Sequence, residues 1–481
     1  MKARELENLG IPRGECMQLA LRVIADAARG GMNKSQLRDT VQSVIRDPSS
    51  HVTDPSFGPL AKALADNIAK PQAATDYVQR AEPAPWKQWG SDLEPESVQQ
   101  MRNACELPVA GALMPDAHLG YGLPIGGVLA TQNAVIPYAV GVDIACRMKL
   151  TVLEVPGGAN AIRAEQDRLI NAIERETRFG VGAAFSKPHE HPVLDEDWTV
   201  SPVTHHGKRK AQSQLGTSGS GNHFVEFGTL TIENDAPDLH LKAGVYLALL
   251  THSGSRGTGA AVADYYSKLA MKLRPELPKQ LKHLAWLDLD TQDGQEYWNA
   301  MNLMGKHAAA NHDIIHRMIA RNLRADVIAD IENHHNFAWK ETHRVPKPGK
   351  ADDFERREVI VHRKGATPAG KGVLGIIPGS MASPGFLVRG KGNEASLHSA
   401  SHGAGRVMSR TKAKESFTWS AVKKLLAERD VTLLSAGIDE VPGVYKDIHH
   451  VMSQQSDLVE IVGRFDPRIV KMAPAGERAE D

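Results

Sequence analysis

Three stretches of the sequence place histidine beside small or polar residues, a pattern that suits metal binding. His223 follows a Ser-Gly-Ser-Gly-Asn turn, His252 leaves an apolar run into Ser-Gly-Ser-Arg-Gly, and His335 stands between His334 and Asn336. Small neighbours let a cation approach closely, and polar neighbours orient the imidazole ring. A lone histidine is usually structural, but three such loops in one chain favour a metal cluster.

Asp143 and Cys146 form a second candidate for metal binding, three residues apart after an apolar segment. If the chain turns there, the carboxylate and the thiol converge on one cation. A thiolate with an oxygen ligand suits Zn or Mn(II) much better than Mg. This pair alone indicates little, because a free cysteine commonly packs as a small buried hydrophobe.

The run His402-Gly403-Ala404-Gly405-Arg406 has the composition of a phosphate-binding loop. Backbone N–H groups of a short Gly-Ala-Gly run can surround an anion, and an arginine fork matches two phosphate oxygens. His402 is then either a ligand of that phosphate or the group that attacks it. Further cations and glycine-rich loops indicate more than one phosphate, as in a nucleotide plus a phosphorylated end: Arg363, Lys364, Gly379 and Ser380.

Other histidines are expected to have no chemical role. His307, His312 and His316 lie on a predicted amphipathic helix, and no glutamate follows His312 as it does in a helical zinc motif. We therefore expect these three to pack in the core. His205-His206 and the Gly-Lys-Arg-Lys run after them predict a mobile, solvated basic loop, with contact to an RNA backbone as the alternative.

Periodicity divides the chain into a helical N-terminal region, 1–83, and a larger α+β region, 84–472. Three short helices are expected in the first region, on the spacing of Met17, Leu21, Ile24 and Ala28, then Leu37, Val41 and Val44 after a cap at Ser35, then Leu60, Leu64 and Ile68. The second region is expected to hold strands near 125–130, 146–155 and 244–250, and helices near 161–177, 294–323 and 419–429. Residues 473–481 predict a flexible tail.

Composition describes a soluble globular chain. Its 481 residues are 41% hydrophobic and 24% charged, with 57 basic residues against 57 acidic ones. Zero net charge argues against a bulk polyanion-binding surface, so a nucleic acid would contact a local basic groove. Three cysteines exclude a disulfide framework, and no apolar run approaches the roughly 20 residues of a membrane span. We expect a cytoplasmic protein without a membrane partner.

Ten motifs follow one another between about Trp86 and Val470. They are MPDAHLG, GVDIACRM, LGTSGSGNHFVE, HSGSRGTG, HHNFAWKE, RKGAT, GIIPGSM, VRGKGN, SHGAGRVMSRTKA, and VYKDI with VMSQQSDLVE. In this order they resemble the motifs of the RtcB-type RNA ligases. The first 83 residues lie outside the resemblance.

The resemblance implies a fold and an activity. The fold is a single large α+β catalytic domain with mixed and antiparallel sheets around a metal cleft, plus the small helical extension. The activity is ligation of an RNA 3′-phosphate or 2′,3′-cyclic phosphate to a 5′-hydroxyl, in RNA repair or tRNA splicing. It requires GTP and Mn(II), with two Mn2+ ions, and proceeds through GMP held covalently on a histidine. The extension is open to contact with RNA, control of the oligomeric state, or binding of an archease-like activator.

The resemblance also assigns roles by motif position. The histidine that takes GMP corresponds to His402, and Asp116 matches an acidic residue near the site. The metal ligands correspond to Asp143, Cys146, His223, His252 and His335. Positions that hold the nucleotide correspond to Asn222, Glu226, Ser380, Gly403, Ala404, Gly405 and Arg406. A carboxylate accepts from the N1–H and N2 amino groups of guanine and finds no such pair on adenine, which gives Glu226 a reason to select GTP.

Several positions depart from the family pattern. Ala145 and Arg147 flank the cysteine where the family has glycine, so a positive φ at either would carry a steric cost. Arg147 is open to a position near the metals or to contact with phosphate. After the GSM motif the family continues with glycine and a nearby serine, whereas this chain has Ala382, Pro384 and Gly385, with Ser383 as the substitute for that serine. Lys471 is the candidate for a lysine near the guanine. These changes leave room for a divergent paralogue.

Two other functions remain as alternatives. One is a metal-dependent RNA end-processing phosphoesterase that uses the same site without GTP. The other is a non-catalytic RNA-binding paralogue, whose binding would depend on salt.

Overall fold

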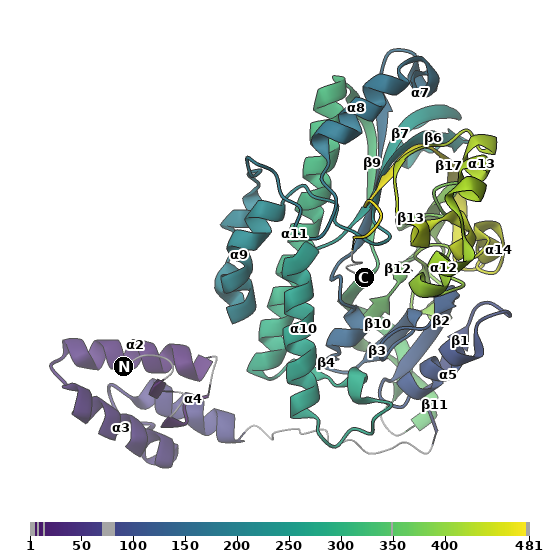
Figure 1. Cartoon of the computed structure of the whole chain (residues 1–481). Helices are drawn as coiled ribbons and strands as arrows, with labels where there is room; N and C mark the ends of the chain where they lie inside the picture. The colour runs from purple at the N-terminus through teal and green to yellow at the C-terminus, as the bar shows by residue number, and fades with distance from the viewer. Residues whose placement is uncertain (1–4, 7–8, 13–14, 70–81, 348–349, 478–481) are drawn as a thin grey trace. The chain divides into compact units, whose positions relative to one another are not determined.

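The computed structural model describes residues 5–6, 9–12, 15–69, 82–347 and 350–477 (Figure 1). The chain divides into two compact units, Met1–Val78 and Gln79–Asp481. The expected boundary at residue 83 adjoins 70–81, which lie outside the described residues, as do 478–481 of the expected tail. Within the described part of the chain, no helix is both long and apolar enough to cross a membrane.

The first unit contains the three helices that the apolar spacing predicts, which confirms the helical N-terminal region. They are α2 (Glu15–Arg29), α3 (Lys34–Arg46) and α4 (Gly58–Ala69), with the short 3-10 turn η1 (Pro48–His51) before α4. Helix α3 begins with a capping box: the Asn33 side chain accepts from the Gln36 N–H, and the Gln36 side chain accepts from the Asn33 N–H. The cap is therefore Asn33, two residues before the expected Ser35. Leu37, Val41 and Val44 of this helix are buried.

The second unit is built on an eight-stranded, mostly antiparallel sheet. Its order is β13-β14-β17-β6-β7-β5-β9, and β16 pairs with β17 in parallel. The strands are β5 (Arg147–Glu154), β6 (Phe224–Ile232), β7 (Gly244–Ser253), β9 (Asp326–His334), β13 (Leu374–Ile377), β14 (Gly385–Gly390), β16 (Thr432–Ser435) and β17 (Val459–Met472).

Both faces of this sheet are covered. One face packs against α8 (Gln166–Glu176) and the C-terminal half of α11 (Gln292–Leu323), the long helix to the left of the strands in Figure 1. Alternate residues supply that core, with Val225 and Phe227 of β6 beneath Ile173 and Ile315 of the helices. The other face buries a second cluster that includes Leu150, Leu230, Ile376 and Phe465.

A second, five-stranded sheet has the order β1-β2-β3-β11-β10. Its strands are β1 (Trp86–Gln88), β2 (Ala110–His118), β3 (Ile125–Thr131), β10 (Asn336–Lys347) and β11 (Lys350–Lys364). Two small sheets pair β4 (Ala134–Val135) with β8 (Leu287–Asp288) and β12 (Ala366–Pro368) with β15 (Ser399–Ser401). The remaining helices are α5 (Pro95–Ala104), α6 (Pro137–Val140), α7 (Ala161–Ala164), α9 (Pro202–Gln214), α10 (Arg256–Leu273), α12 (Arg410–Ser416), α13 (Trp419–Glu428) and α14 (Ile448–Ser453). The α+β prediction is confirmed.

The basic run after His205 is a helix, so the expected loop is wrong. Helix α9 begins with Ser201 as its cap and Pro202 in its first turn, and the Ser201 hydroxyl accepts from the Val203 N–H. Thr204 and Ala211 are buried on one side of the helix. Both start signals were present in the sequence, but the polar composition of the run concealed them.

The N-terminal unit should depend on its few large buried side chains, because so small a core leaves little excess stability. Leu60 is fully buried and Leu21 is 37% exposed. Leu60→Ala should cost roughly 2–5 kcal/mol, and Leu21→Ala, the matched control, should cost much less. Amide hydrogen exchange should therefore speed up in α2–α4 of Leu60→Ala and stay unchanged in β6 and β7. Equal protection of α2–α4 in the two variants would contradict this expectation.

Candidate metal-centred active site

Four adjacent strands of the main sheet each place one candidate ligand at the same end of the sheet, where the strands begin or finish. His223 precedes β6, Cys146 precedes β5, His252 lies near the end of β7, and His335 follows β9. Because β6, β7, β5 and β9 are antiparallel neighbours, the start of one strand lies beside the end of the next. Asp143 joins them from the turn between α6 and β5. Side chains far apart in the sequence therefore meet in one place.

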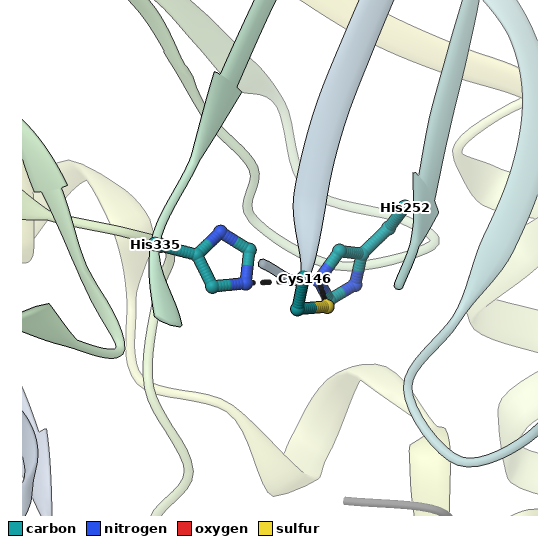
Figure 2. A group of neighbouring side chains, drawn as sticks. All are labelled: Cys146, His252 and His335. Atoms are coloured by element: carbon teal, nitrogen blue, oxygen red, sulfur yellow. Dashed lines mark hydrogen bonds between the residues drawn. The ribbon is translucent and has the colours of Figure 1, made fainter. Parts of the chain in front are cut away.

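The ligand atoms form two triads that share the thiol. Cys146, His252 and His335 form one, and Asp143, Cys146 and His223 form the other. Cys146 Sγ lies 3.1 Å from His252 Nε2 and 3.4 Å from His223 Nε2. His252 Nε2 lies 3.3 Å from His335 Nε2, and Figure 2 shows the first triad's side chains pointing toward one another.

Hydrogen bonds on the far side of two rings decide which nitrogen faces the centre. His223 Nδ1 donates to the Ser218 carbonyl at 2.8 Å, and His252 Nδ1 donates to the Asn222 carbonyl at 3.3 Å. Each Nε2 therefore presents a lone pair, and His223 Nε2 faces the Asp143 carboxylate at 3.1 Å. Acceptors packed this closely without a proton between them suit a cation.

Burial also favours the ligand form of the imidazoles. It lowers the pKa of His252 to about 3 and holds the pKa of His335 well below its usual value. Both rings are neutral at pH 7, as metal binding requires. One thiolate, three imidazoles and one carboxylate fit Mn(II) or Zn, and divalent cations here would be held by the five residues that the resemblance indicates.

The two residues that flank Cys146 differ: Ala145 has an unusual backbone conformation, and Arg147 has a buried side chain. Ala145 has φ +56°, so its Cβ carries the expected steric cost, about 1 kcal/mol. Arg147 has no such φ, and its side chain does not reach outward. Its guanidinium is buried, donating to Glu332 at 3.0 Å and to the Gly305 carbonyl at 3.1 Å. The outward contact with phosphate is therefore wrong, whereas the positive charge does lie close enough to interact electrostatically with Cys146.

His402 lies beside the first triad and is held by a buried acid. Its ring centroid is 4.8 Å from that of His335. Its Nδ1 donates to Asp116 Oδ2 at 2.7 Å, and the His402 and Gly403 N–H groups donate to the same oxygen at 3.2 and 3.4 Å. Burial opposes the charge on Asp116, but the hydrogen bond and charge of His402 leave its pKa below the usual value. In the neutral ring, this hydrogen bond leaves the lone pair on Nε2.

A β-bulge presents Asp116 to His402. The pairing of β2 with β3 shifts between Leu113 and His118, so extra residues of β2 oppose Gly126. Gly126 has φ +84°, and a Cβ there would lie 3.1 Å from Asp116 Oδ1. The close approach of Asp116 to the neighbouring strand therefore depends on glycine at position 126.

The ligands and His402 line a single cavity of about 630 Å3, a size that accommodates a nucleotide. It also contains all but one of the positions that the resemblance assigns to the nucleotide: Asn222, Glu226, Ser380, Gly403, Ala404, Gly405 and Arg406. Ser383 lies there too, with its Oγ 3.0 Å from Ser380 Oγ. Asp116 is fully buried behind His402 rather than on the cavity wall.

Lys471 is the position that the structure does not bring to the cavity. Strand register pairs Lys471 with Val225 and Val470 with Glu226. Val225 packs beneath α8, and Lys471 follows it to that face, where its Nζ donates to Glu174 at 2.7 Å. A strand alternates faces at every residue, so a lysine one position away from the cavity face points away from it.

Arg363 is also absent from the cavity, contrary to the phosphate-binding prediction. It is buried and donates to both oxygens of Glu341, at 2.6 and 2.9 Å. Its neighbour Lys364 does line the cavity and donates to the Tyr121 carbonyl at 2.6 Å, and burial lowers the pKa of Lys364 to about 7.

Sequence reasoning missed the ion network at the far side of the His402 loop. Arg406 donates to Glu440 at 3.1 Å and to the Asp439 carbonyl at 2.9 Å. Arg410 lines the same cavity and also pairs with Glu440. Lys446 donates to the carbonyls on both sides of Asp116, at 3.0 and 2.9 Å. Arg410 and Lys446 stand inside motifs quoted above, so their motif membership was the available signal.

The helical histidines are structural, as predicted. His312 and His316 are buried and meet the Thr251 hydroxyl at 2.6 and 2.8 Å. His307 is buried and lies 3.2 Å from the Ala211 carbonyl of α9. These contacts pack α11 behind the strands that hold the ligands.

The family model and the individual proteins to which this chain is similar all point to the same family. Residues 100–472 match the family model described as tRNA-splicing ligase RtcB. The chain is 34% identical to the RNA-splicing ligase RtcB of Escherichia coli K12 over 419 residues, 79% of this chain and 95% of that protein. It is 31% identical to the tRNA-splicing ligase RtcB of Nanoarchaeum equitans over 447 residues, 78% of this chain and 91% of that protein. It is also 31% identical to the RNA-splicing ligase RtcB of Mycobacterium tuberculosis over 436 residues, 76% of this chain and 98% of that protein.

The shared thiol makes a prediction about metal stoichiometry. Cys146→Ser should abolish tight binding of both cations, because Sγ belongs to both triads, whereas His335→Gln should remove one cation only. Equilibrium dialysis of the metal-stripped chain against Mn2+, followed by metal analysis, would measure this. Cys16→Ser, in the N-terminal unit, is the control and should match the parent. Two tightly bound equivalents in Cys146→Ser would exclude a shared thiolate.

Proposed function

The chain belongs to the RtcB family of tRNA-splicing ligases, and we propose that it is a GTP- and Mn(II)-dependent RNA ligase. It joins an RNA 3′-phosphate or 2′,3′-cyclic phosphate to a 5′-hydroxyl, through GMP held covalently on His402. The observation that carries the proposal is the pair formed by His402 and buried Asp116, 2.7 Å apart, beside a cluster of metal-binding side chains. The resemblance to the family drawn from the motifs is itself confirmed.

The tautomer of His402 suits nucleophilic attack. Its Nδ1–H is held by Asp116, so Nε2 attacks the α-phosphorus of GTP with an available lone pair. The N–P bond forms, the bond from the α-phosphorus to the bridging oxygen breaks, and pyrophosphate leaves. The ring keeps its Nδ1 proton and gains positive charge, which the Asp116 carboxylate stabilises.

Cations held by Asp143, Cys146, His223, His252 and His335 would neutralise the charge of the triphosphate and of the leaving pyrophosphate. The protein's own contribution is to fix His402 against that charge. Gly405 supports this arrangement, since it has φ +74° and a Cβ there would lie 2.0 Å from the Asp116 carbonyl oxygen. Only glycine lets the His402 loop approach the Asp116 strand so closely.

The remaining steps return His402 to its starting state. The RNA 3′-phosphate attacks the GMP phosphorus and releases the imidazole, and the 5′-hydroxyl of the second RNA then displaces GMP to form the phosphodiester. A 2′,3′-cyclic end must first be opened by water to give the 3′-phosphate.

Glu226 supports selection of guanine. It is 5% exposed, on the cavity side of β6, and burial raises its pKa well above the usual value. An isolated buried carboxylate is costly, and the N1–H and N2 amino groups of guanine are donors that would offset this cost. Adenine offers no equivalent pair.

The nucleophile is tested by incubation with Mn2+ and α-labelled GTP, followed by denaturing electrophoresis. The parent and the control His206→Ala, an exposed histidine of α9, should carry a covalent label, and His402→Ala should carry none. Asp116→Asn should label about 100- to 10,000-fold more slowly, because an amide in place of the orienting carboxylate favours the wrong tautomer of His402. Ligation of RNA with defined ends should fail in the same variants. Phosphate release from RNA without GTP, with no adduct, would instead support the phosphoesterase.

The guanine contact is tested with Glu226→Gln. Its preference for GTP over ATP in adduct formation should fall about 10- to 100-fold, since a hydrogen bond to a charged group contributes roughly 1.5–3 kcal/mol. GTP affinity of the parent should rise with pH through the raised pKa of Glu226, because only the carboxylate accepts both guanine donors. Competition binding across pH would measure this, and the pH dependence should disappear in Glu226→Gln. An unchanged GTP preference would remove Glu226 from guanine recognition.

A further inference from the structure

A third group of metal-binding side chains lies apart from the cavity. His343 of β10, Glu394 of the short 3-10 turn η7 (Glu394–Ser396) and His398 just after it place their ligand atoms within 4.8 Å of one another. His343 Nδ1 lies 3.9 Å from Glu394 Oε2, and His398 Nε2 lies 3.7 Å from Glu394 Oε1. The two imidazole centroids are 4.6 Å apart. None of the three lines the cavity that holds His402.

His343 is built as a ligand rather than as a packed side chain. Its Nε2 donates to Glu341 Oε2 at 2.7 Å, and Arg363 holds both oxygens of that carboxylate. With both oxygens held by Arg363, Glu341 is the acceptor of this hydrogen bond and the lone pair lies on His343 Nδ1. His343 is 1% exposed, and its Nδ1 has no hydrogen-bond partner. This buried lone pair faces Glu394, in the carboxylate–histidine arrangement that orients metal ligands.

The opposite side of the group is held in a strained backbone. Leu397 and His398 have φ +52° and +50°, a conformation that non-glycine residues seldom adopt. Arg363 donates to the Leu397 carbonyl at 2.9 Å, which ties this turn to the residue that orients Glu341. Arg356 donates to Glu394 Oε1 at 3.1 Å and leaves Oε2 facing His343. This strained turn places the His398 ring beside His343, whose Nδ1 has no hydrogen-bond partner.

We propose that His343 Nδ1, the Glu394 carboxylate and His398 Nε2 bind a Zn2+ ion, with the fourth position open to solvent. Two imidazoles and one carboxylate are a common tetrahedral zinc set, with bonds of about 2.0–2.2 Å. That geometry needs ligand atoms roughly 3.3–3.5 Å apart. His398 Nε2 and His343 Nδ1 lie 3.7 and 3.9 Å from the two different oxygens of Glu394, and one ligand atom from each residue lies within 4.8 Å of the others, so side-chain rotation would bring them to one ion. Glu394 and His398 side chains are 45% and 26% exposed, which gives the ion a path from solvent.

The bound ion would fasten the turn at 394–398 onto β10. His398 is followed directly by β15 (Ser399–Ser401) and then by His402, and β10 follows His335. The ion would therefore stabilise the segments that lead to the nucleophile and to one metal ligand. The inference does not depend on the proposed ligase activity, because it concerns a site outside the cavity.

Zinc binding by the full chain tests the proposal. The metal-stripped protein is equilibrated with Zn2+, washed and analysed for metal content, and its affinity is measured by competition with a zinc indicator. His398→Asn and Glu394→Gln should each bind one equivalent fewer than the parent, with at least about 100-fold weaker affinity at that site. Asparagine tolerates a positive φ, so His398→Asn keeps the turn. The control is His450→Gln, which alters an exposed histidine 3.2 Å from Asp92 that belongs to no such group.

Cobalt distinguishes this site from the cluster around Cys146. A Co2+ ion bound by Cys146 gives a thiolate charge-transfer band, whereas one bound by His343, Glu394 and His398 does not. The band should be the same in His398→Asn and in the parent, while total Co2+ falls by one equivalent. Equal numbers of tightly bound Zn2+ in the parent, His398→Asn and Glu394→Gln would overturn the proposal, as would loss of the thiolate band with the missing equivalent.

Discussion

The structure of the site depends on acceptor atoms packed around one thiol. Cys146 Sγ lies 3.1 and 3.4 Å from two imidazole nitrogens, and one of these lies 3.3 Å from a third ring. Such a group is unfavourable in an apolar interior unless a cation lies among its members. Four antiparallel strands provide the rigidity that holds it, since the thiol and the three imidazoles each lie at or beside the end of one of these strands. Burial then keeps the rings neutral and ready to bind.

The fold also places the candidate nucleophile, His402, beside the side chains around Cys146. His402 directly follows β15 of a different small sheet, and it reaches the ligands because Gly405 allows its loop to lie against the Asp116 strand. Asp116 is fully buried, yet three N–H donors from this loop and the nearby Lys446 keep it charged. Desolvation is the largest single effect on the pKa of this carboxylate, but hydrogen bonding and nearby positive charges together outweigh it. The outcome is an imidazole with a fixed tautomer beside a centre suited to divalent cations.

Several basic residues that resemble phosphate ligands have structural partners instead. Arg363 joins β11 to Glu341 and to the turn at Leu397, and Arg147 joins the start of β5 to Glu332. Arg406 lines the cavity, but Glu440 and the Asp439 carbonyl already accept from its guanidinium. A buried guanidinium needs such partners, because an unpaired charge is costly inside a protein. These pairs hold the loops that surround the cavity.

The sequence alone was sufficient for the helical first unit, the α+β second unit and most of the candidate residues that gather around the cavity. Apolar periodicity and glycine-rich loops are local signals, and the motifs retain ligand identity whatever the strand order. Only the tertiary structure decided which neighbours point into the cavity. Lys471, Arg363 and Arg147 each sit one residue from a position facing the site, and a shift of one residue along a strand reverses the face. The sharing of Cys146 by two triads, and the meeting of His343 with His398, likewise depend on strand order and register, which bring distant segments together and leave no local signal in the sequence.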